Sequence, residues 1–228
     1  MKKSDFELSD FIIQSPYAIT PADAKAIGKA SNGNPQKDDW EKDTLKNFKE
    51  HVRVYYRKQQ NKKCAYCRMD ISAATSYFPI EHIVPKSLHP EWMYEPLNLC
   101  VACANCNSAK NNQEVLSDKN TAVLPADSSG YIIIHPHFDR YFEHIEIVDG
   151  LLYKGLTPKG TKTIEMCNLT RIGLLSERAK QLITKDQENF RYSKLLITYT
   201  QNSMWIADTD KLLKEIQELM ESLEVPMG

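Results

Sequence analysis

Four cysteines arranged as two Cys-x-x-Cys pairs are the residues whose spacing points most directly to chemistry. The first knuckle is Cys64/Cys67 and the second knuckle is Cys103/Cys106. Cysteines two residues apart can hold one ion from a tight turn, and a distant second pair completes a tetrahedron of thiolates around Zn²⁺. Four thiolates leave no open position, so we expect a structural zinc that closes the intervening loop. Cys100 and Cys103 share the spacing, but Cys103/Cys106 is preferred because a helix can then start directly from the second knuckle.

A second set of polar residues lies inside this loop and just beyond it: Glu81, His82, Asn98 and Asn107. Hydrolysis of a phosphodiester needs an attacking water, a base to take its proton and a cation near the phosphate. His82 has the intrinsic pKa of such a base, and Asn98 is suited to orient the imidazole or to fix the loop backbone. Glu81 and Asn107 offer hard oxygen ligands, which suit Mg²⁺ or Mn²⁺. This set predicts a metal-dependent nuclease.

Short elements must position these residues. The run "YFPI" predicts a strand that delivers Glu81 and His82, "NLCVAC" predicts a returning strand, and "NCNSAKNNQEVLS" predicts a helix after the second knuckle. Consecutive side chains on a strand point to opposite faces. A bulge, or a bend at Pro85, would therefore be needed to bring Glu81 and His82 into one site.

A long helix is predicted over residues 38–62, capped by Asp38 or Asp39, with an apolar face that ends at Tyr55/Tyr56. A basic stripe runs beside that face and is either an ordinary solvated surface or a phosphate-contacting one. The residues that we expect to contact nucleic acid are Lys49, Arg53, Arg57, Lys86 and Lys110. Before this helix, "TPADAKAIGKA" predicts a short helix with Thr20 as N-cap and Pro21 at its first position.

The chain beyond residue 120 predicts further strands and helices. "YIIIH" predicts a strand, and "IEIVDGLLYKG" predicts a hairpin with Asp149-Gly150 at the turn. Helices are predicted over 159–167, 171–200 and 207–224, the last of them acidic. The expected organisation is α+β, with an N-terminal arm over 1–39, a nuclease core with its preceding basic helix over 40–120, and a hairpin and mainly helical region over 121–228.

Bulk properties limit the classes of protein. The chain has 228 residues and a formal net charge of −1, so any nucleic-acid binding must use a local patch. No apolar run approaches ~18 residues, so no membrane span is expected. Acidic residues interrupt "MKKSDFELSD", so a secretory signal is not expected and a cytoplasmic location is. Cys100 and Cys167 are left over and are interpreted as small core residues.

A histidine-rich segment leaves two alternatives open. His135, His137, Asp139 and His144 are close together in "HPHFDRYFEH". They form either a second metal site or, as we prefer, a polar network that packs this segment against the nuclease core.

The run "CAYC … IEHIVPKS … LNLCVACANCNSAKNN" resembles the HNH endonuclease family, whose ββα-metal fold carries a four-cysteine zinc. The resemblance covers about residues 61–117 and implies that His82 is the general base, positioned by Asn98, with Glu81 as the acidic metal ligand. Asn107 stands where many members have the third histidine, a departure similar to the Asn-containing variants. The resemblance also implies cleavage of DNA to a 5′-phosphate and a 3′-hydroxyl.

Outside that run, the basic helix and "IIIHPHFDRYFEHI … DG … NLTR … ER" resemble a PtuB-like subgroup in bacterial anti-phage defence, found in Septu systems and certain retrons. That subgroup works beside an ATPase partner. This chain shows no ATPase motif of its own, because in "GLTPKGTK" Thr161 replaces the lysine that a P-loop requires. The resemblance therefore implies that any ATPase is another chain.

Two other functions compete with an autonomous DNA nuclease. One is a zinc-stapled nucleic-acid binder that does not cleave, which Asn107 in place of histidine leaves open. The other is an interaction subunit whose nuclease acts only within a complex. RNA as the substrate is not excluded by the residues.

Overall fold

The computed structural model describes residues 11–71 and 78–185, and within this range it leaves the side chains of 179–185 undescribed. The helix predicted over 207–224, and the predicted helix 171–200 beyond residue 185, lie outside the described residues. Within them, helices combine with two-stranded antiparallel sheets, which confirms the α+β class.

The N-terminal part contributes α1 (Pro21–Ser31), which begins as predicted. Thr20 Oγ1 accepts a hydrogen bond from the backbone N–H of Asp23, and the Asp23 carboxylate accepts one from the N–H of Thr20. This reciprocal capping satisfies two N–H groups that a helix start leaves without partners.

The single helix predicted over 38–62 is wrong. The structure has two 3-10 turns, η1 (Lys37–Glu41) and η2 (Asp43–Leu45), followed by α2 (Lys46–Gln59). The break falls at Lys42, whose backbone is extended with φ −65° and ψ 138°. The Asp39 carboxylate accepts from the N–H of Gln36 and so caps the first turn instead of a long helix. The predicted apolar face of α2 is buried through Phe48, Val52 and Tyr56.

The central sheet pairs β1 (Ile80–His82) with β2 (Leu99–Val101), and α3 (Ala104–Lys110) follows, in the predicted order. The strands are antiparallel, with His82 opposite Leu99. Between them, the β1–β2 loop (residues 83–98) carries η3 (Pro90–Trp92) and η4 (Pro96–Asn98).

Strands of three residues are too short to be stable alone, so other groups must hold this sheet. The side-chain amide of Gln60, the residue after α2, pairs with both backbone groups of Val101. Its Nε2 donates to the Val101 carbonyl at 2.7 Å, and its Oε1 accepts from the Val101 N–H at 2.8 Å. The N–H of Ala65, in the first knuckle, donates to the same carbonyl at 3.1 Å. The sheet is therefore tied to the end of α2 and to the first knuckle.

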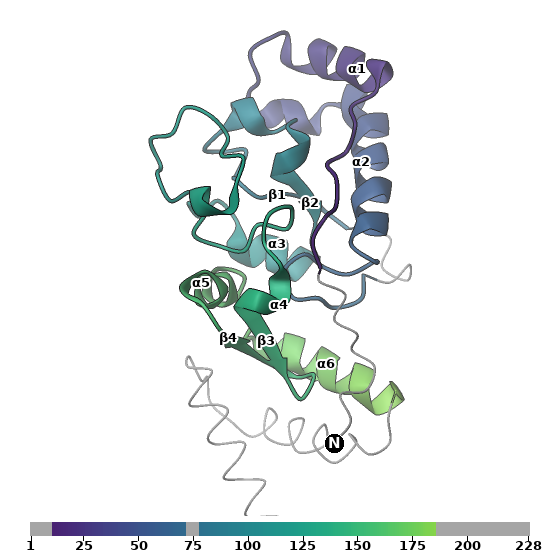
Figure 1. The fold of residues 1–228 in the computed structure, drawn as a ribbon. Helices are drawn as coiled ribbons and strands as arrows, with labels where there is room; N and C mark the ends of the chain where they lie inside the picture. The colour runs from purple at the N-terminus through teal and green to yellow at the C-terminus, as the bar shows by residue number, and fades with distance from the viewer. Residues whose placement is uncertain (1–10, 72–77, 186–228) are drawn as a thin grey trace, which may run out of the picture.

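After η5 (Ser128–Gly130), the chain forms what we call the C-terminal unit, residues 141–185. Its elements are α4 (Tyr141–His144), β3 (Ile145–Val148), β4 (Leu152–Gly155), α5 (Pro158–Met166) and α6 (Ile172–Lys185). The predicted hairpin is confirmed, and its turn residues Asp149 and Gly150 have φ 50° and 70°. Figure 1 shows this unit at the opposite end of the molecule from α1, with α3 between the central sheet and α5.

The strand predicted over residues 131–135 is wrong. Tyr131 forms an isolated bridge with Leu116, and the residues after it have no strand partner. Side chains satisfy part of this backbone instead, because the N–H of His135 donates to the Asp139 carboxylate at 2.6 Å. The isoleucine run after Tyr131 therefore forms an irregular, buried segment instead of a strand.

The glycines of "GLTPKGTK" have a packing role. Any side chain at Gly160 in α5 would overlap the carbonyl oxygen of His144. A side chain at Gly155 in β4 would overlap Thr161. The glycines therefore allow α5 to lie directly on α4 and β4.

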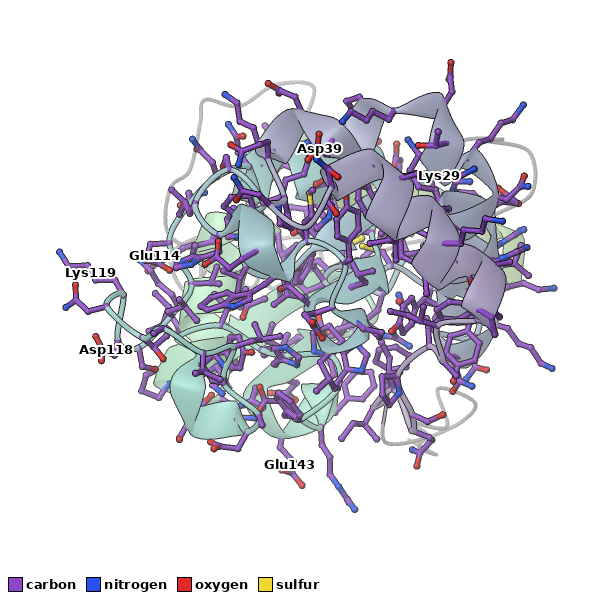
Figure 2. All side chains as sticks on the ribbon, turned by 90° about the horizontal axis from the view of Figure 1, so that it is seen from above. Lys29, Asp39, Glu114, Asp118, Lys119 and Glu143 are labelled. Carbon is purple, nitrogen blue, oxygen red and sulfur yellow. The ribbon has the colours of Figure 1, made fainter. Side chains whose placement is uncertain are left out.

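The rim of the molecule is charged (Figure 2). Asp118 and Lys119 project side by side from the loop after α3, and Glu143 projects from α4. Among the described residues, no helix has both the length and the apolar composition to span a bilayer.

Candidate functional site

The four predicted cysteines form one cluster. The sulfur atoms of Cys64, Cys67, Cys103 and Cys106 all lie within 4.8 Å of one another. Cys67 Sγ is 3.8 Å from Cys103 Sγ, which equals the edge of about 3.8 Å of a sulfur tetrahedron with Zn–S bonds of about 2.3 Å. The cluster therefore fits a metal ion such as zinc. It also settles the pairing, because Cys100 lies outside it.

Two backbone N–H groups point at these sulfurs. The N–H of Cys103 donates to Cys64 Sγ at 3.3 Å, and the N–H of Cys106 donates to Cys103 Sγ at 3.4 Å. The second bond caps the start of α3, as predicted for a helix that begins at the second knuckle. Cys100 and Cys167 are fully buried core residues, again as predicted.

Arg171, the last residue of the "NLTR" run noted in the sequence, also reaches this cluster, a contact that was not predicted. Its Nη2 lies 3.6 Å from Cys106 Sγ and 3.9 Å from Cys103 Sγ. Burial alone would lower the pKa of Arg171, but the negative sulfurs, chiefly Cys106, outweigh burial and raise it. Arg171 lies far along the chain from both knuckles, so neither spacing nor periodicity brings it to notice.

His82 is buried, and its contacts define which ring nitrogen can act as a base. Its Nε2 lies 3.2 Å from the carbonyl oxygen of Met93 in the β1–β2 loop. A carbonyl can only accept, so Nε2 carries the hydrogen and Nδ1 carries the lone pair of the neutral ring. Burial, helped by Lys86 and Lys110, lowers the pKa of His82 to about 3, against the bond to Met93. The ring is therefore neutral near pH 7, and a pKa this low makes it a weaker base than a free imidazole.

Asn98 fixes the loop that holds this ring. Its Oδ1 accepts from the N–H of Val84 at 2.7 Å, and its Nδ2 donates to the carbonyls of Val84 and Trp92 at 3.0 and 3.1 Å. The sequence left two roles open for Asn98, orienting the imidazole or fixing the loop backbone. These bonds go to the loop backbone and agree with the second role. They set the path of the residues that lead to the Met93 carbonyl.

Trp40 covers the imidazole and was missed by sequence reasoning. The ring centroids of Trp40 and His82 are 4.4 Å apart with an interplanar angle of 77°, an edge contact. Lys49 Nζ donates to the Trp40 carbonyl at 2.9 Å and holds this turn against α2. The break at Lys42, which the sequence did not predict, is what separates Trp40 from the helix.

Glu81 has different partners from His82. Its Oε1 lies 2.8 Å from Lys110 Nζ and 3.2 Å from the hydroxyl of Tyr66. Burial raises the pKa of Glu81, and Lys110 and Tyr66 oppose that rise. The Glu81 carboxylate and the His82 ring therefore bond to different groups, and a bend that brings them into one site stays a prediction.

Lys110 does not match the expected phosphate contact. Its side chain is completely buried, and its Nζ donates to the carbonyl of His82 at 3.0 Å as well as pairing with Glu81. An ammonium group with no exposed surface is not available to a nucleic acid. Lys110 instead ties α3 to β1.

Asn107 lies in the first turns of α3 and is half-buried. It precedes Lys110 by three residues, so both side chains lie on one face of the helix. Asn107 is therefore one helical turn from the partner of Glu81.

The other predicted nucleic-acid contacts are half-buried and bond to the protein's own backbone. Each donates to one carbonyl: Lys49 to Trp40, Arg53 to Phe78, Arg57 to Ile71 and Lys86 to Lys37. These bonds tie α2 and the β1–β2 loop to neighbouring segments. Contact between these side chains and nucleic acid stays a prediction.

The histidine-rich segment forms a polar network. Asp139 accepts from Ser128, from the N–H of His135 and from Lys159, whose Nζ lies 3.1 Å away. His137 Nε2 lies 2.8 Å from the carbonyl of Leu99 in β2. Among the described residues, the four cysteines form the metal-binding group and these side chains form none. The preferred interpretation of the segment therefore agrees with its contacts.

Comparison with known proteins finds similarity in the central region and beyond it. The model of the HNH endonuclease family matches residues 64–113, within the stretch predicted from the sequence. The chain is also similar to the Septu protein PtuB of Bacillus thuringiensis, with 27% identity over 127 residues. That match covers 56% of this chain and 44% of PtuB, so it spans less than half of that relative.

Proposed function

We propose that the protein is a metal-dependent DNA endonuclease of bacterial anti-phage defence, because residues 64–113 match the HNH endonuclease model and the chain is similar to the Septu protein PtuB. The observation that carries the proposal is the state of His82. A neutral imidazole is held through Nε2, with the lone pair on Nδ1, inside a ββα segment closed by four cysteines.

In the proposed reaction, His82 Nδ1 takes a proton from the attacking water. The Met93 carbonyl holds the ring through the opposite nitrogen, so the base does not have to reorient during the reaction. Asn98 keeps that carbonyl in place through its bonds to the loop. Proton transfer to a positioned base typically contributes on the order of 10²–10⁴-fold to the rate.

Glu81 and Asn107 are the proposed ligands of a catalytic Mg²⁺ or Mn²⁺. Both present hard oxygen donors, and such ions keep several waters when few protein ligands are available. A cation bound there would offset the charge that develops on the phosphate and on the leaving oxygen. Glu81 would have to exchange part of its contact with Lys110 for the ion. The products would carry a 5′-phosphate and a 3′-hydroxyl.

The four-cysteine cluster is proposed to hold zinc in a purely structural role. With all four positions filled by sulfur, the ion has no site left for water or phosphate. Its contribution is to hold the two knuckles together, so that β1, β2 and α3 keep their arrangement.

The Glu81–Lys110 pair favours a second candidate, in which the nuclease acts only within a complex. In the described chain the proposed metal ligand is occupied by a buried ammonium. A partner that shifted α3 would release the carboxylate. Similarity to a Septu protein makes an ATPase the partner to test, and invading DNA in the cytoplasm the proposed substrate.

The decisive experiment is a plasmid nicking assay in Mg²⁺ or Mn²⁺, with a chelator control, for the wild type and His82→Ala. We expect nicking by the wild type and its loss, by at least about 100-fold, in the variant. A matched control is His51→Gln, which changes an exposed histidine on α2. Zinc content and circular dichroism should be the same for all three proteins. Full cleavage by a folded His82→Ala protein would overturn the role of His82.

The two candidates separate in the same assay. A wild-type chain that is inactive alone and active after addition of an ATPase from the neighbouring genes supports the second. DNA binding without cleavage under either condition would mean that the region binds nucleic acid without hydrolysing it.

A further inference from the structure

The contact of Arg171 with the cysteine cluster joins two parts of the chain. The sulfurs belong to the HNH region, whereas Arg171 lies between α5 and α6 of the C-terminal unit. The guanidinium also donates from Nη1 to the carbonyls of Cys167 and Asn168, at 3.1 and 2.9 Å. These bonds fix the group at the end of α5, so Nη2 is presented to the sulfurs of Cys103 and Cys106 by a held side chain.

Charge explains why a cation belongs at this position. Four thiolates around one Zn²⁺ leave two net negative charges, and bound thiolates keep lone pairs that accept hydrogen bonds. An arginine is always protonated and offers several N–H groups from one rigid plane. Groups of this kind, placed outside the ligands themselves, orient the ligands and tune the metal site.

The same unit also holds the first knuckle. Arg178 Nη2, in α6, donates to the carbonyl of Cys67 at 2.8 Å, and the hydroxyl of Tyr153, in β4, donates to the same oxygen. Arg178 Nε in turn lies 2.6 Å from that hydroxyl. The C-terminal unit therefore contacts both knuckles. Arg171 bonds to the sulfurs of the second knuckle, and Arg178 and Tyr153 bond to the backbone of the first.

We propose that Arg171 is a positioning residue of the zinc centre, which stabilises the thiolates of the second knuckle and couples zinc retention to attachment of the C-terminal unit. The inference rests on the proposed zinc and goes beyond the nuclease function. Because coupling between two sites is reciprocal, loss of Arg171 weakens zinc retention, and loss of zinc weakens the attachment of the unit.

The test compares the full-length chain with Arg171→Met, Arg171→Lys and a matched control, Lys162→Met. Lys162 is exposed on α5 and pairs with Glu165 at 3.1 Å, so the control removes one positive charge from the same unit away from the sulfurs. Zinc release into excess chelator is followed with a colorimetric indicator, and folding is checked by circular dichroism. Loss of such a group typically costs about 10–100-fold in metal affinity, so we expect Arg171→Met to release zinc about 10-fold faster or more.

Arg171→Lys keeps the charge but lacks the rigid plane, so its release rate should fall between the wild type and Arg171→Met. Lys162→Met should match the wild type. Co²⁺-loaded proteins give a second readout that depends on the sulfurs: removal of the N–H donors should move the sulfur-to-cobalt charge-transfer absorption to lower energy in Arg171→Met only.

A folded Arg171→Met protein with wild-type zinc release and an unshifted cobalt spectrum would overturn the proposal. If Arg171→Met does not fold, Arg171→Lys provides the test. Zinc release from Arg171→Lys that is no faster than from Lys162→Met would then refute the proposal. Wild-type protein purified without zinc would instead refute the zinc centre itself, so the two failures can be told apart.

Discussion

At the scale of the residue, the pair of Glu81 and Lys110 limits what the site can do. Both side chains are almost completely buried, and Lys110 also bonds to the carbonyl of His82. A buried ion pair is costly to desolvate, and its partners depend on each other because either one alone leaves an uncompensated charge. Glu81 can therefore bind a metal only if its ion pair with Lys110 is weakened or replaced.

Replacing Lys110 with methionine tests this dependence. The Glu81 carboxylate would be left buried without its cation, so we expect Lys110→Met to lower the free energy of unfolding by about 3–5 kcal/mol. The double variant with Glu81→Gln should recover much of that loss. Urea denaturation measures both. A Lys110→Met protein of native stability with weakened DNA binding would support the original prediction of a phosphate contact.

At the scale of the element, β2 depends on a histidine from outside the HNH region. His137 Nε2 is 2.8 Å from the carbonyl of Leu99, the residue that faces His82 across the sheet. Its ring also makes an edge contact with Tyr56 of α2, with centroids 5.4 Å apart. His137 therefore packs the middle of the chain against the strand that aligns the candidate base.

We expect His137→Ala to destabilise the protein by about 1–3 kcal/mol, because the buried Leu99 carbonyl loses its donor. The metal content should not change, since His137 contacts no cysteine of the cluster. Urea denaturation and elemental analysis check the two statements. Loss of a bound ion from a protein that is still folded would show that this segment holds a metal after all.

The same histidine predicts a pH dependence. Burial lowers the pKa of His137 to about 4, against the bond to Leu99, whereas an unfolded histidine titrates near about 6.5. Between these values the unfolded chain binds more protons, so stability falls as the pH drops through this window. Glutamine does not titrate, so the stability of His137→Gln should not fall in this window. The difference in free energy of unfolding between the wild type and this variant should therefore be smaller at pH 5 than at pH 7, as measured by urea titrations. A constant difference would contradict the pKa shift.

The elements that sequence reasoning found were those governed by local chemistry. The capping residues of α1, the Asp149-Gly150 turn and the spacing of the knuckles act within a few residues, and each formed as predicted. The predictions that were wrong concern segments whose structure depends on long-range contacts. Residues 131–135 have the composition of a strand, but tertiary packing holds them without a partner strand. The break before α2 follows from where Trp40 is buried, which no local pattern reveals.

At the scale of the whole molecule, the cysteine cluster connects parts that are distant in the sequence. Tyr141, at the start of the C-terminal unit, donates from its hydroxyl to the carbonyl of Tyr66 in the first knuckle at 2.7 Å. Together with Arg178 and Arg171, this places the knuckles between the central sheet and the C-terminal unit. The metal centre is therefore expected to report on the integrity of both.

Removing the metal should therefore affect more than the HNH region. We expect a chelator that strips the zinc to abolish a single cooperative melting transition, and to increase amide exchange in α5 and β4 as well as in β1 and β2. Zinc binding contributes about 10–16 kcal/mol of free energy in small zinc-finger peptides. Losing a contribution of that size would be enough to unfold a core with such short strands. Scanning calorimetry and hydrogen exchange measure the change. An unchanged transition after verified metal loss would contradict this role.

The turn that carries Trp40 has a practical consequence for anyone who wishes to transplant the region that matches the HNH family. The family match begins at Cys64, yet the ring that shields His82 belongs to η1, and the amide that completes β2 is Gln60. A fragment trimmed to the matched borders would expose the imidazole to water and leave Val101 without its partner. A minimal graft would have to start no later than Lys37, where η1 begins.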